Sequence, residues 1–381
     1  MPSLPRARSD RRAKSRGLIT VRAARYYGNK DIRIEEIDEP TAGAGEVLID
    51  VAFCGICGTD LHEYLDGPIF CPTPDTPTSW TGETAPVTLG HEFSGVVAAL
   101  GEGITDLEVG DTVVVEPYIL KDGTDTGPDS TDYHLSEGMN FIGLGGGGGG
   151  LAEKLAVRRR WVHKIDPSIP LDQAALIEPL AVAYHGVQRS GAKAGDIAVI
   201  GGAGPIGLLT GAVLRALGVT VVISELSSLR RQKALDSGAA DHALDPAAVD
   251  VAQEVHDLTG GKGADIAFEA TSVQAVLDTL MDALRPTGVL LNISIWGHRS
   301  DFDMHKLVMK EIDLRGSIGY VNNHPAVIEL VESGKIDLAP FITGRIQLED
   351  LIDKGFDTLI HRNETAVKIL VSPSGKGVDP A

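Results

Sequence analysis

Two patterns of hydrophobic and polar residues divide the chain. Residues 21–156 carry short runs in which apolar and polar side chains alternate, separated by Gly, Pro and Asp. Examples are EVLIDVAF (residues 46–53), GVVAAL (residues 95–100) and DTVVVEPYI (residues 111–119). A period of two places every second side chain on one face of a strand. This part of the chain is therefore predicted to be an irregular, mainly β domain.

After residue 196 the pattern changes to alternating strands and helices. An apolar run leads into a glycine turn, a helix that ends at Gly218 and a second strand that closes at Glu225. The alternation continues with a helix over residues 229–237, a strand over 264–270, a helix over 273–284, and strands over 288–295 and 312–318. This order predicts an α/β fold, with a doubly wound parallel sheet covered by helices on both faces. The tail after residue 320 is of mixed character and is expected to rejoin the first domain.

The sequence contains one low-complexity segment, a run of six glycines at residues 145–150. Glycine adopts backbone conformations that other residues avoid. The run is therefore either a flexible linker or a tight backbone turn beside a site.

The predicted turn between the first strand and helix of the second domain has the sequence GAGPIG, residues 202–207. In such a motif the first glycine permits the turn, the second lets the backbone approach a pyrophosphate, and the third allows close helix–strand packing. The helix N-terminus supplies amide donors. An acidic residue about 20 residues further on, here Glu225, should accept the ribose hydroxyls. The expected cofactor-binding residues are Gly202, Gly204, Pro205, Ile206, Gly207, Glu225 and Arg230.

Glu225 also bears on the choice between NAD and NADP. A carboxylate at this position would repel a 2′-phosphate, so NAD is the expected cofactor. Arg230 and Arg231, which lie in the next helix, could instead swing toward a phosphate, or could simply face solvent.

Charge and composition limit the partners. The formal net charge is -19. Such a surface repels nucleic acid and anionic membranes, so neither is an expected partner. The three cysteines cluster at residues 54–71, which is no disulfide framework and indicates a reducing compartment, the cytoplasm. Since no apolar run approaches the ~18 residues of a membrane span, the protein is expected to be soluble. The Arg-rich residues 1–20 are predicted to be a disordered basic tail, with an organelle transit peptide as the alternative.

Three segments each carry one side chain of a type that binds zinc. They are Cys57 in CGICGTDLHEY, His91 in LGHEFSGVV and Glu178 in LIEPLAVAYH. A set of one sulfur, one nitrogen and one oxygen ligand leaves a fourth position open, as a catalytic zinc requires. Each residue alone would be unremarkable, since a lone Cys is usually core and a lone His or Glu is usually solvated or paired.

Together these segments resemble the zinc-containing medium-chain alcohol dehydrogenase family, over essentially the whole chain from residue 21 onward. The resemblance implies that Cys57, rather than Cys54, and His91 bind the catalytic zinc. It also implies a Rossmann-type domain over residues 181–320 and a GroES-like, mainly β catalytic domain over residues 21–180. Residues 321–381 would then return to the catalytic domain. Family members suggest a homo-oligomer, either a dimer or a tetramer.

The resemblance assigns further roles around the metal. In the polyol and butanediol branch a glutamate at the domain junction, here Glu178, replaces the cysteine of other branches. Glu92 would be either an exchanging ligand or a carboxylate behind the ligands, and Asp60 would orient His91. The family relay implies that Thr59 accepts the alcohol proton and passes it through the nicotinamide ribose to His62. The alternatives are a strand-end hydroxyl for Thr59 and a surface histidine for His62.

Within the family, CGICGTDLHEYLDGPIF and GHEFSGVV are most similar to the butanediol branch and next to the sorbitol branch. The implied reaction is NAD-linked oxidation of a small secondary alcohol or vicinal diol, with 2,3-butanediol to acetoin as the preferred case. A sorbitol-type or threonine-type dehydrogenase is the main alternative. A zinc-free quinone reductase and a non-catalytic binding protein on the same fold are more distant ones.

One departure from the family concerns its second, structural zinc. Most members hold this ion with four cysteines shortly after the Glu-Pro that follows the β run. The corresponding positions here are about Asp122, Asp125, Pro128 and Ser136, and no cysteine occurs in this region. These side chains do not form a tetrahedral thiolate site. One zinc per subunit is therefore expected.

Overall fold

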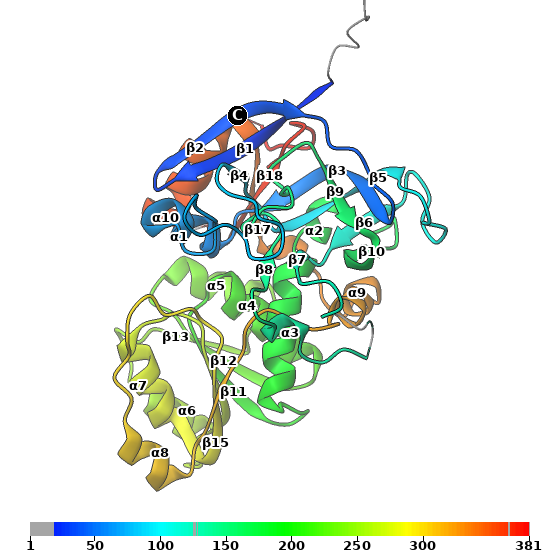
Figure 1. Cartoon of the computed structure of the whole chain (residues 1–381). Helices are drawn as coiled ribbons and strands as arrows, with labels where there is room; N and C mark the ends of the chain where they lie inside the picture. Colours follow the sequence, from blue (N-terminus) through cyan, green and yellow to red (C-terminus); the bar gives the residue numbers. More distant parts are fainter. Residues whose placement is uncertain (1–18, 125–126, 128, 365, 381) are drawn as a thin grey trace, which may run out of the picture.

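The computed structural model describes residues 19–124, 127, 129–364 and 366–380. The chain forms two parts, one mainly β and one with alternating strands and helices, with the C-terminal residues lying back in the first part (Figure 1). The basic tail predicted for residues 1–20 lies almost entirely outside the described residues. Among the described residues no helix is long and apolar enough to cross a membrane.

The central sheet of the β part is built from both ends of the chain. Its strands lie in the order β10 (Val162–Lys164), β6 (Thr112–Val115), β5 (Glu92–Leu100), β3 (Glu46–Gly55), β18 (Lys368–Ser372) and β17 (Ile342–Gln347), with β9 (Lys154–Arg158) also paired to β3. β18 pairs antiparallel with β3 at Val371 and Cys54. The tail after residue 320 thus supplies two strands to the first sheet, while the exact division at residues 180 and 320 stays a prediction.

Smaller elements complete this part. A second sheet contains β2 (Asp31–Asp38), β1 (Thr20–Gly28) and β4 (Val87–Thr88), and a short ribbon pairs β7 (Tyr118–Ile119) with β8 (Asn140–Phe141). The helices here are α1 (Gly58–Asp66), α2 (Leu171–Ala174) and α10 (Asp357–His361). The segment at residues 111–119, predicted as one strand, forms β6 and β7 because Pro117 has no N–H to continue the ladder. Glu116, at the break, is fully buried.

The second part contains the predicted parallel sheet. Its strands lie in the order β13 (His242–Leu244), β12 (Thr220–Ser224), β11 (Ile197–Gly201), β14 (Ala264–Glu269), β15 (Leu284–Asn292) and β16 (Asp313–Gly316), and all neighbours are parallel. The strand order reverses between β11 and β14. Ligands bind at such a switch point, outside the carboxyl ends of the strands.

Helices cover both faces of this sheet. They are α3 (Ile177–Ser190), α4 (Pro205–Ala216), α5 (Ser228–Asp236), α6 (Val251–Leu258), α7 (Gln274–Ala283) and α8 (Met304–Lys310), whereas α9 (His324–Glu332) packs against α3. Successive residues of β11 alternate between two hydrophobic clusters. Ala198 and Ile200 pack with residues of α3 and α4, whereas Val199 packs with residues of α6 and α7. The apolar strand is therefore buried on both faces, as parallel sheets require.

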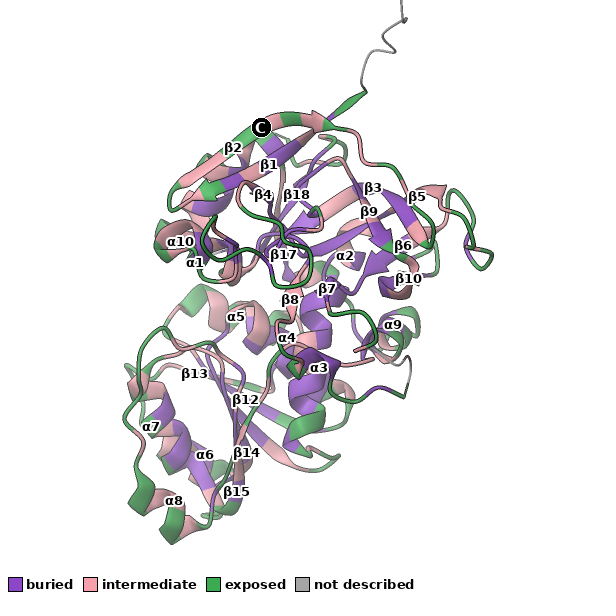
Figure 2. Cartoon of the chain, in the orientation of Figure 1, coloured by how far each residue is buried: buried purple, intermediate pink, exposed green. Residues whose placement is uncertain are grey.

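Helix α3 joins the two parts. It is buried over much of its length (Figure 2) and contacts α4 and β15 of the second part as well as β5 and β6 of the first. It begins at Ile177, so the predicted metal ligand Glu178 lies in its first turn. A rigid helix thus fixes this carboxylate at the junction of the two parts.

The glycine run at residues 145–150 is a packed turn rather than a flexible linker. Gly146, Gly147 and Gly148 all have positive φ angles. A Cβ on Gly149 would lie 2.4 Å from the Leu89 carbonyl oxygen. The turn therefore lies against the backbone that leads into His91.

We predict that Gly149→Ala destabilises the protein by about 1–3 kcal/mol, because the added methyl group overpacks against backbone that cannot move aside. Thermal and denaturant unfolding measure the change. Gly297→Ala is the matched control, since a Cβ there meets nothing within 4 Å. Equal stability of the two variants would contradict the packed-turn interpretation.

Candidate active site and metal centre

A cavity of about 430 Å³ lies between the two parts of the chain. Its lining combines polar groups of the first part with loops at the carboxyl ends of β11, β14, β15 and β16. Most of the predicted metal and relay residues line it: Cys57, Thr59, His62, His91, Glu92 and Glu178. Ile206, from the predicted dinucleotide turn, lines it as well. The structure therefore brings segments distant in sequence to one site.

Cys57 and Asp60 are placed by the start of α1. Cys57 caps the helix, and its backbone N–H donates to Asp60 Oδ2 at 2.9 Å. This arrangement holds the thiol at the end of β3, facing the cavity. Cys54 instead is a buried residue of β3, as expected for the cysteine that is not a ligand.

Three potential ligand atoms converge next to the cavity. One atom each from Cys57, His91 and Glu92 lies within 4.8 Å of the other two. Burial alone would lower the pKa of His91, but its neighbours, Cys57, Asp60 and Glu178, together raise it by more, so that this pKa lies well above its ordinary value. The set of S, N and O donors fits zinc, and its negative surroundings favour a cation.

Asp60 lies behind His91. It is fully buried, and its Oδ1 is 3.7 Å from His91 Nδ1; among the described residues neither atom has a hydrogen-bond partner. Burial raises the pKa of Asp60 to about 6, although His91 acts in the opposite direction. The distance is too long for a hydrogen bond. The pair is nevertheless placed as a carboxylate that orients a metal-binding imidazole would be.

Glu92 forms a buried ion pair that sequence reasoning missed. Lys368 Nζ lies 2.8 Å and 2.6 Å from its two carboxylate oxygens and donates to the Ile56 carbonyl at 3.1 Å. Both side chains are almost wholly buried. Burial lowers the pKa of Lys368, but its neighbours, Glu92 first among them, together raise it by more, so that this pKa lies above its ordinary value. Since the partners are 276 residues apart, no local pattern could have indicated the pair.

Glu178 lines the same cavity but is not part of the group of three converging ligand atoms. Its Oε1 accepts a hydrogen bond from the Tyr320 hydroxyl at 2.7 Å. Burial raises the pKa of Glu178 to about 7, and the neighbouring His91 lowers it. The structure thus places Glu92 with Cys57 and His91, whereas the role of Glu178 as the third ligand stays a prediction.

The two predicted relay residues lie at different depths. Thr59 Oγ1 is 3.7 Å from Cys57 Sγ, so the hydroxyl lies at the metal centre. His62 is at the cavity rim, with 62% of its side chain exposed and Nδ1 3.9 Å from Asp66. An exposed imidazole can exchange protons with solvent, as the final group of a relay must.

The glycine-rich turn has the geometry expected of a dinucleotide site. Gly202 has φ +97°, and a Cβ on Gly207 would lie 2.1 Å from the Gly202 carbonyl oxygen. A Cβ on Gly204 would meet nothing within 4 Å, which leaves this position open to an approaching phosphate. Pro205 is the first residue of α4, whose N-terminus faces the same space.

Glu225, the residue that follows β12, contacts the glycine-rich turn. Its carboxylate accepts hydrogen bonds from the N–H groups of Ala203 and Ser227, both at 2.8 Å. Arg231 is paired with Asp245 at 2.8 Å. Arg230 donates at 2.7 Å to the carbonyl of Asn363, in the C-terminal segment, and its cofactor role stays a prediction.

Of the four positions that correspond to the structural zinc ligands, Asp122 and Ser136 belong to neither group of potential metal ligands in the described part of the chain. Asp122 pairs with Arg158, while Asp125 and Pro128 lie outside the described residues. Glu116, His163 and His324 form a second group of side chains whose types can bind a metal ion.

The comparisons with known proteins define the class. The domain described as "Alcohol dehydrogenase GroES-like domain" matches residues 43–167, and that described as "Zinc-binding dehydrogenase" matches residues 205–333. The chain belongs to the zinc-binding alcohol dehydrogenase family. It is an oxidoreductase that uses zinc and a nicotinamide dinucleotide, and the predicted family and fold class are confirmed.

Particular relatives narrow the comparison. The chain is 60% identical to the (R,R)-butanediol dehydrogenase of Neisseria gonorrhoeae, covering 93% of this chain and 100% of the relative. The crystal structure of 2R,3R-butanediol dehydrogenase from Bacillus subtilis has a TM-score of 0.87 at 44% identity, covering 93% and 99%. Sorbitol dehydrogenase of Bacillus subtilis is 30% identical, covering 93% and 98%. The predicted order of resemblance is thereby confirmed.

We predict that Cys57→Ala and His91→Ala each abolish activity and lower the zinc content while the fold persists, because each removes one donor from the converging group. Mass-spectrometric metal analysis measures the zinc content, and circular dichroism checks that the fold persists. Cys71→Ala is the control, since this buried cysteine does not belong to the converging group. Full turnover by a zinc-free Cys57→Ala protein would rule the site out.

Proposed function

We propose that this enzyme oxidises a small secondary alcohol or vicinal diol with NAD, and that its preferred reaction is the reversible conversion of 2,3-butanediol to acetoin. The observation that carries the proposal is the 60% identity to a butanediol dehydrogenase over 93% of the chain. The Cys57, His91 and Glu92 group at the cavity supports it, because a member of the family without catalytic activity would not need these three potential zinc ligands. A non-catalytic binding role is disfavoured for the same reason.

Cys57, His91 and one glutamate, Glu178 or Glu92, would hold the zinc. A zinc ion at this position supplies a Lewis acid that lowers the pKa of the substrate hydroxyl. The protein's own contribution is to fix the donors. Asp60 lies behind His91, Lys368 neutralises Glu92, and Tyr320 holds Glu178. One zinc per subunit is proposed, since the chain has no cysteine available for a thiolate structural site.

Thr59 and His62 would move the alcohol proton. The Thr59 hydroxyl lies inside the cavity, where it can accept the proton, and His62 at the rim can deliver it to solvent. The hydride acceptor, the nicotinamide ring, would lie against the ends of β14 and β15, where residues 270–272 and 293–295 line the cavity. The walls around the reacting carbon include apolar side chains such as Phe70, Phe141 and Leu144.

NAD is the proposed cofactor. Glu225 is held by the backbone of the glycine-rich turn, so its charge stays where a 2′-phosphate would lie. Asp245 neutralises Arg231, and Arg230 is turned toward the C-terminal segment. Both arginine side chains thus already interact with other groups of the protein. We further propose a homo-oligomer, by analogy with the family, and a cytoplasmic location, which the free thiols support.

Comparing kcat/KM for NAD and NADP tests the cofactor proposal. We predict at least about a tenfold preference for NAD, since charge repulsion of a few kcal/mol opposes the 2′-phosphate. Glu225→Ser should reduce that preference. A clear preference of the native enzyme for NADP would mean that Arg230 or Arg231 controls the pocket instead.

The substrate proposal predicts that 2,3-butanediol is oxidised far more efficiently than 2-butanol. A pocket that binds a second hydroxyl leaves polar groups unpaired when that hydroxyl is missing, at a cost of about 1–3 kcal/mol or more. Steady-state assays with the isomers of 2,3-butanediol, 2-butanol, sorbitol and threonine measure the difference. Acetoin reduction should also be observed. A higher kcat/KM for sorbitol or threonine would favour the corresponding alternative while leaving the zinc dehydrogenase class intact.

A further inference from the structure

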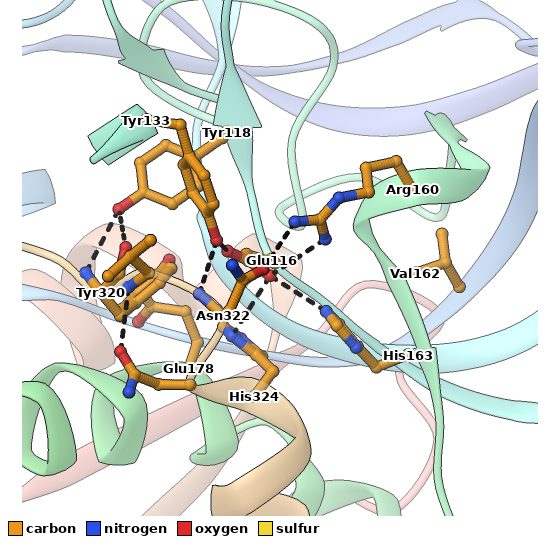
Figure 3. A network of polar contacts seen from close by, with 12 residues as sticks. Glu116, Tyr118, Tyr133, Arg160, Val162, His163, Glu178, Tyr320, Asn322 and His324 are labelled. Carbon is orange, nitrogen blue, oxygen red and sulfur yellow. Dashed lines mark hydrogen bonds and ion pairs between the residues drawn. The ribbon is translucent and has the colours of Figure 1, made fainter. Parts of the chain in front are cut away.

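A buried polar network surrounds Glu116, at the start of the region without cysteines (Figure 3). Glu116, between β6 and β7, is fully buried. The Tyr133 hydroxyl donates to its Oε1, and His163 Nε2 lies 3.1 Å from its Oε2. Arg160 Nη1 is 3.8 Å from the same Oε2. One carboxylate therefore contacts groups from two other segments of the chain.

The network already contains a positively charged side chain beside its carboxylate. Glu116, His163 and His324 are of ligand type, but the Arg160 guanidinium already supplies a fixed positive charge beside the carboxylate. Arg160 also stacks on Trp161 and donates to the Asn322 side chain at 2.8 Å. Burial lowers the pKa of His324 to about 3, so this ring is neutral. A cation would have to lie next to Arg160, which electrostatic repulsion disfavours.

The Tyr133 hydroxyl links Glu116 to the segment that precedes α9. Besides donating to Glu116, it accepts a hydrogen bond from the Asn322 N–H at 2.7 Å. Asn322 has φ +52°, a left-handed conformation that surrounding contacts must maintain. Nearby, the Tyr118 hydroxyl donates to the Tyr320 carbonyl at 2.8 Å and accepts from the Tyr320 N–H at 3.2 Å. Two phenol groups thus clamp the backbone of residues 320–322.

This clamped backbone leads directly to the cavity. Residues 317–319 line it, and a Cβ on Gly319 would lie 2.6 Å from the Tyr118 hydroxyl. The Tyr320 ring is fully buried and points at Glu178, with the hydroxyl 2.7 Å from Oε1 (Figure 3). Tyr118, Tyr133 and Tyr320 pack edge to face around one another, with Tyr118 in contact with both partners. The network therefore ends on a carboxylate of the active site.

We propose that Glu116 is a positioning residue for the dehydrogenase reaction. Through Tyr133 it fixes the backbone of residues 320–322, and through Tyr320 this backbone sets the orientation of Glu178 beside the Cys57 and His91 ligands. The network takes the place of a structural metal in holding the cysteine-free region against the active site. The proposal rests on the proposed function.

A double-mutant cycle tests this chain of contacts. Tyr133→Phe removes the hydroxyl between Glu116 and Asn322, and Tyr320→Phe removes the one on Glu178, while both keep the aromatic packing. We expect each single variant to lose about tenfold in kcat, with KM for NAD unchanged, because coupled contacts of this kind are worth roughly 1–2 kcal/mol. The double variant should be no slower than Tyr320→Phe alone. Losses that multiply would overturn the proposal, since they would mean that the two residues act independently.

Two further measurements separate positioning from folding. The rate of zinc release to a chelator should rise in both single variants, because a loosened Glu178 disturbs the metal surroundings. Tyr27→Phe is the matched control, since the Tyr27 hydroxyl donates to Glu35 at the surface, and it should change neither kcat nor the rate of zinc release. Glu116→Gln, which keeps an acceptor for Tyr133, should lose less activity than Tyr133→Phe. An equal loss in Tyr27→Phe would contradict the proposal.

Metal analysis of the zinc-loaded native enzyme provides the remaining check. We expect one zinc per subunit, with none released when His324 is replaced by Phe. A second equivalent lost in His324→Phe would show that the network is a metal site and not a clamp. If the native enzyme oxidised none of the alcohols, the proposed function would fail, whereas the zinc-release comparison would still decide the role of Tyr133.

Discussion

A buried charge needs an opposite charge nearby, and this constraint governs the junction of the two parts of the molecule. Asp60, Glu92 and Glu178 lie beside a thiol and an imidazole with almost no access to solvent. Lys368 compensates one carboxylate, and burial raises the pKa of the other two. Removing one partner of a buried pair typically costs about 3–5 kcal/mol. The remaining negative charge would be compensated when a divalent cation binds.

The same constraint explains why the chain returns to its first sheet. Lys368 is the first residue of β18, which pairs with β3 beside the start of α1. The strand therefore delivers the lysine to Glu92 and also supports the segment that carries Cys57. Tyr320, which follows the last strand of the dinucleotide-binding part, contacts Glu178. The active site is thus assembled from both parts, and neither part alone contains all of its groups.

The sequence predicted the features that depend on local patterns. Strand alternation, the helix starts and the GAGPIG turn reflect contacts between residues close in sequence, so the parallel sheet and the dinucleotide turn could be predicted. Cys57 and His91 were identified because their motifs resemble a family. Lys368, Tyr320 and the Glu116 network were not, since their partners are more than 100 residues away or are chosen by packing. The motif resemblance left Glu92 as either an exchanging ligand or a carboxylate behind the ligands, and the structure places one of its oxygens with the ligand atoms of Cys57 and His91.

The coordination of the zinc tests the account most directly. X-ray absorption spectroscopy at the zinc edge counts sulfur ligands, which lie about 2.3 Å from zinc, against nitrogen and oxygen ligands at about 2.0–2.1 Å. The purified native enzyme should show one sulfur and otherwise nitrogen or oxygen ligands for every zinc, with one zinc per subunit. A spectrum without a sulfur ligand, or one with two or more, would contradict the assignment of a single catalytic zinc to Cys57, His91 and a buried carboxylate.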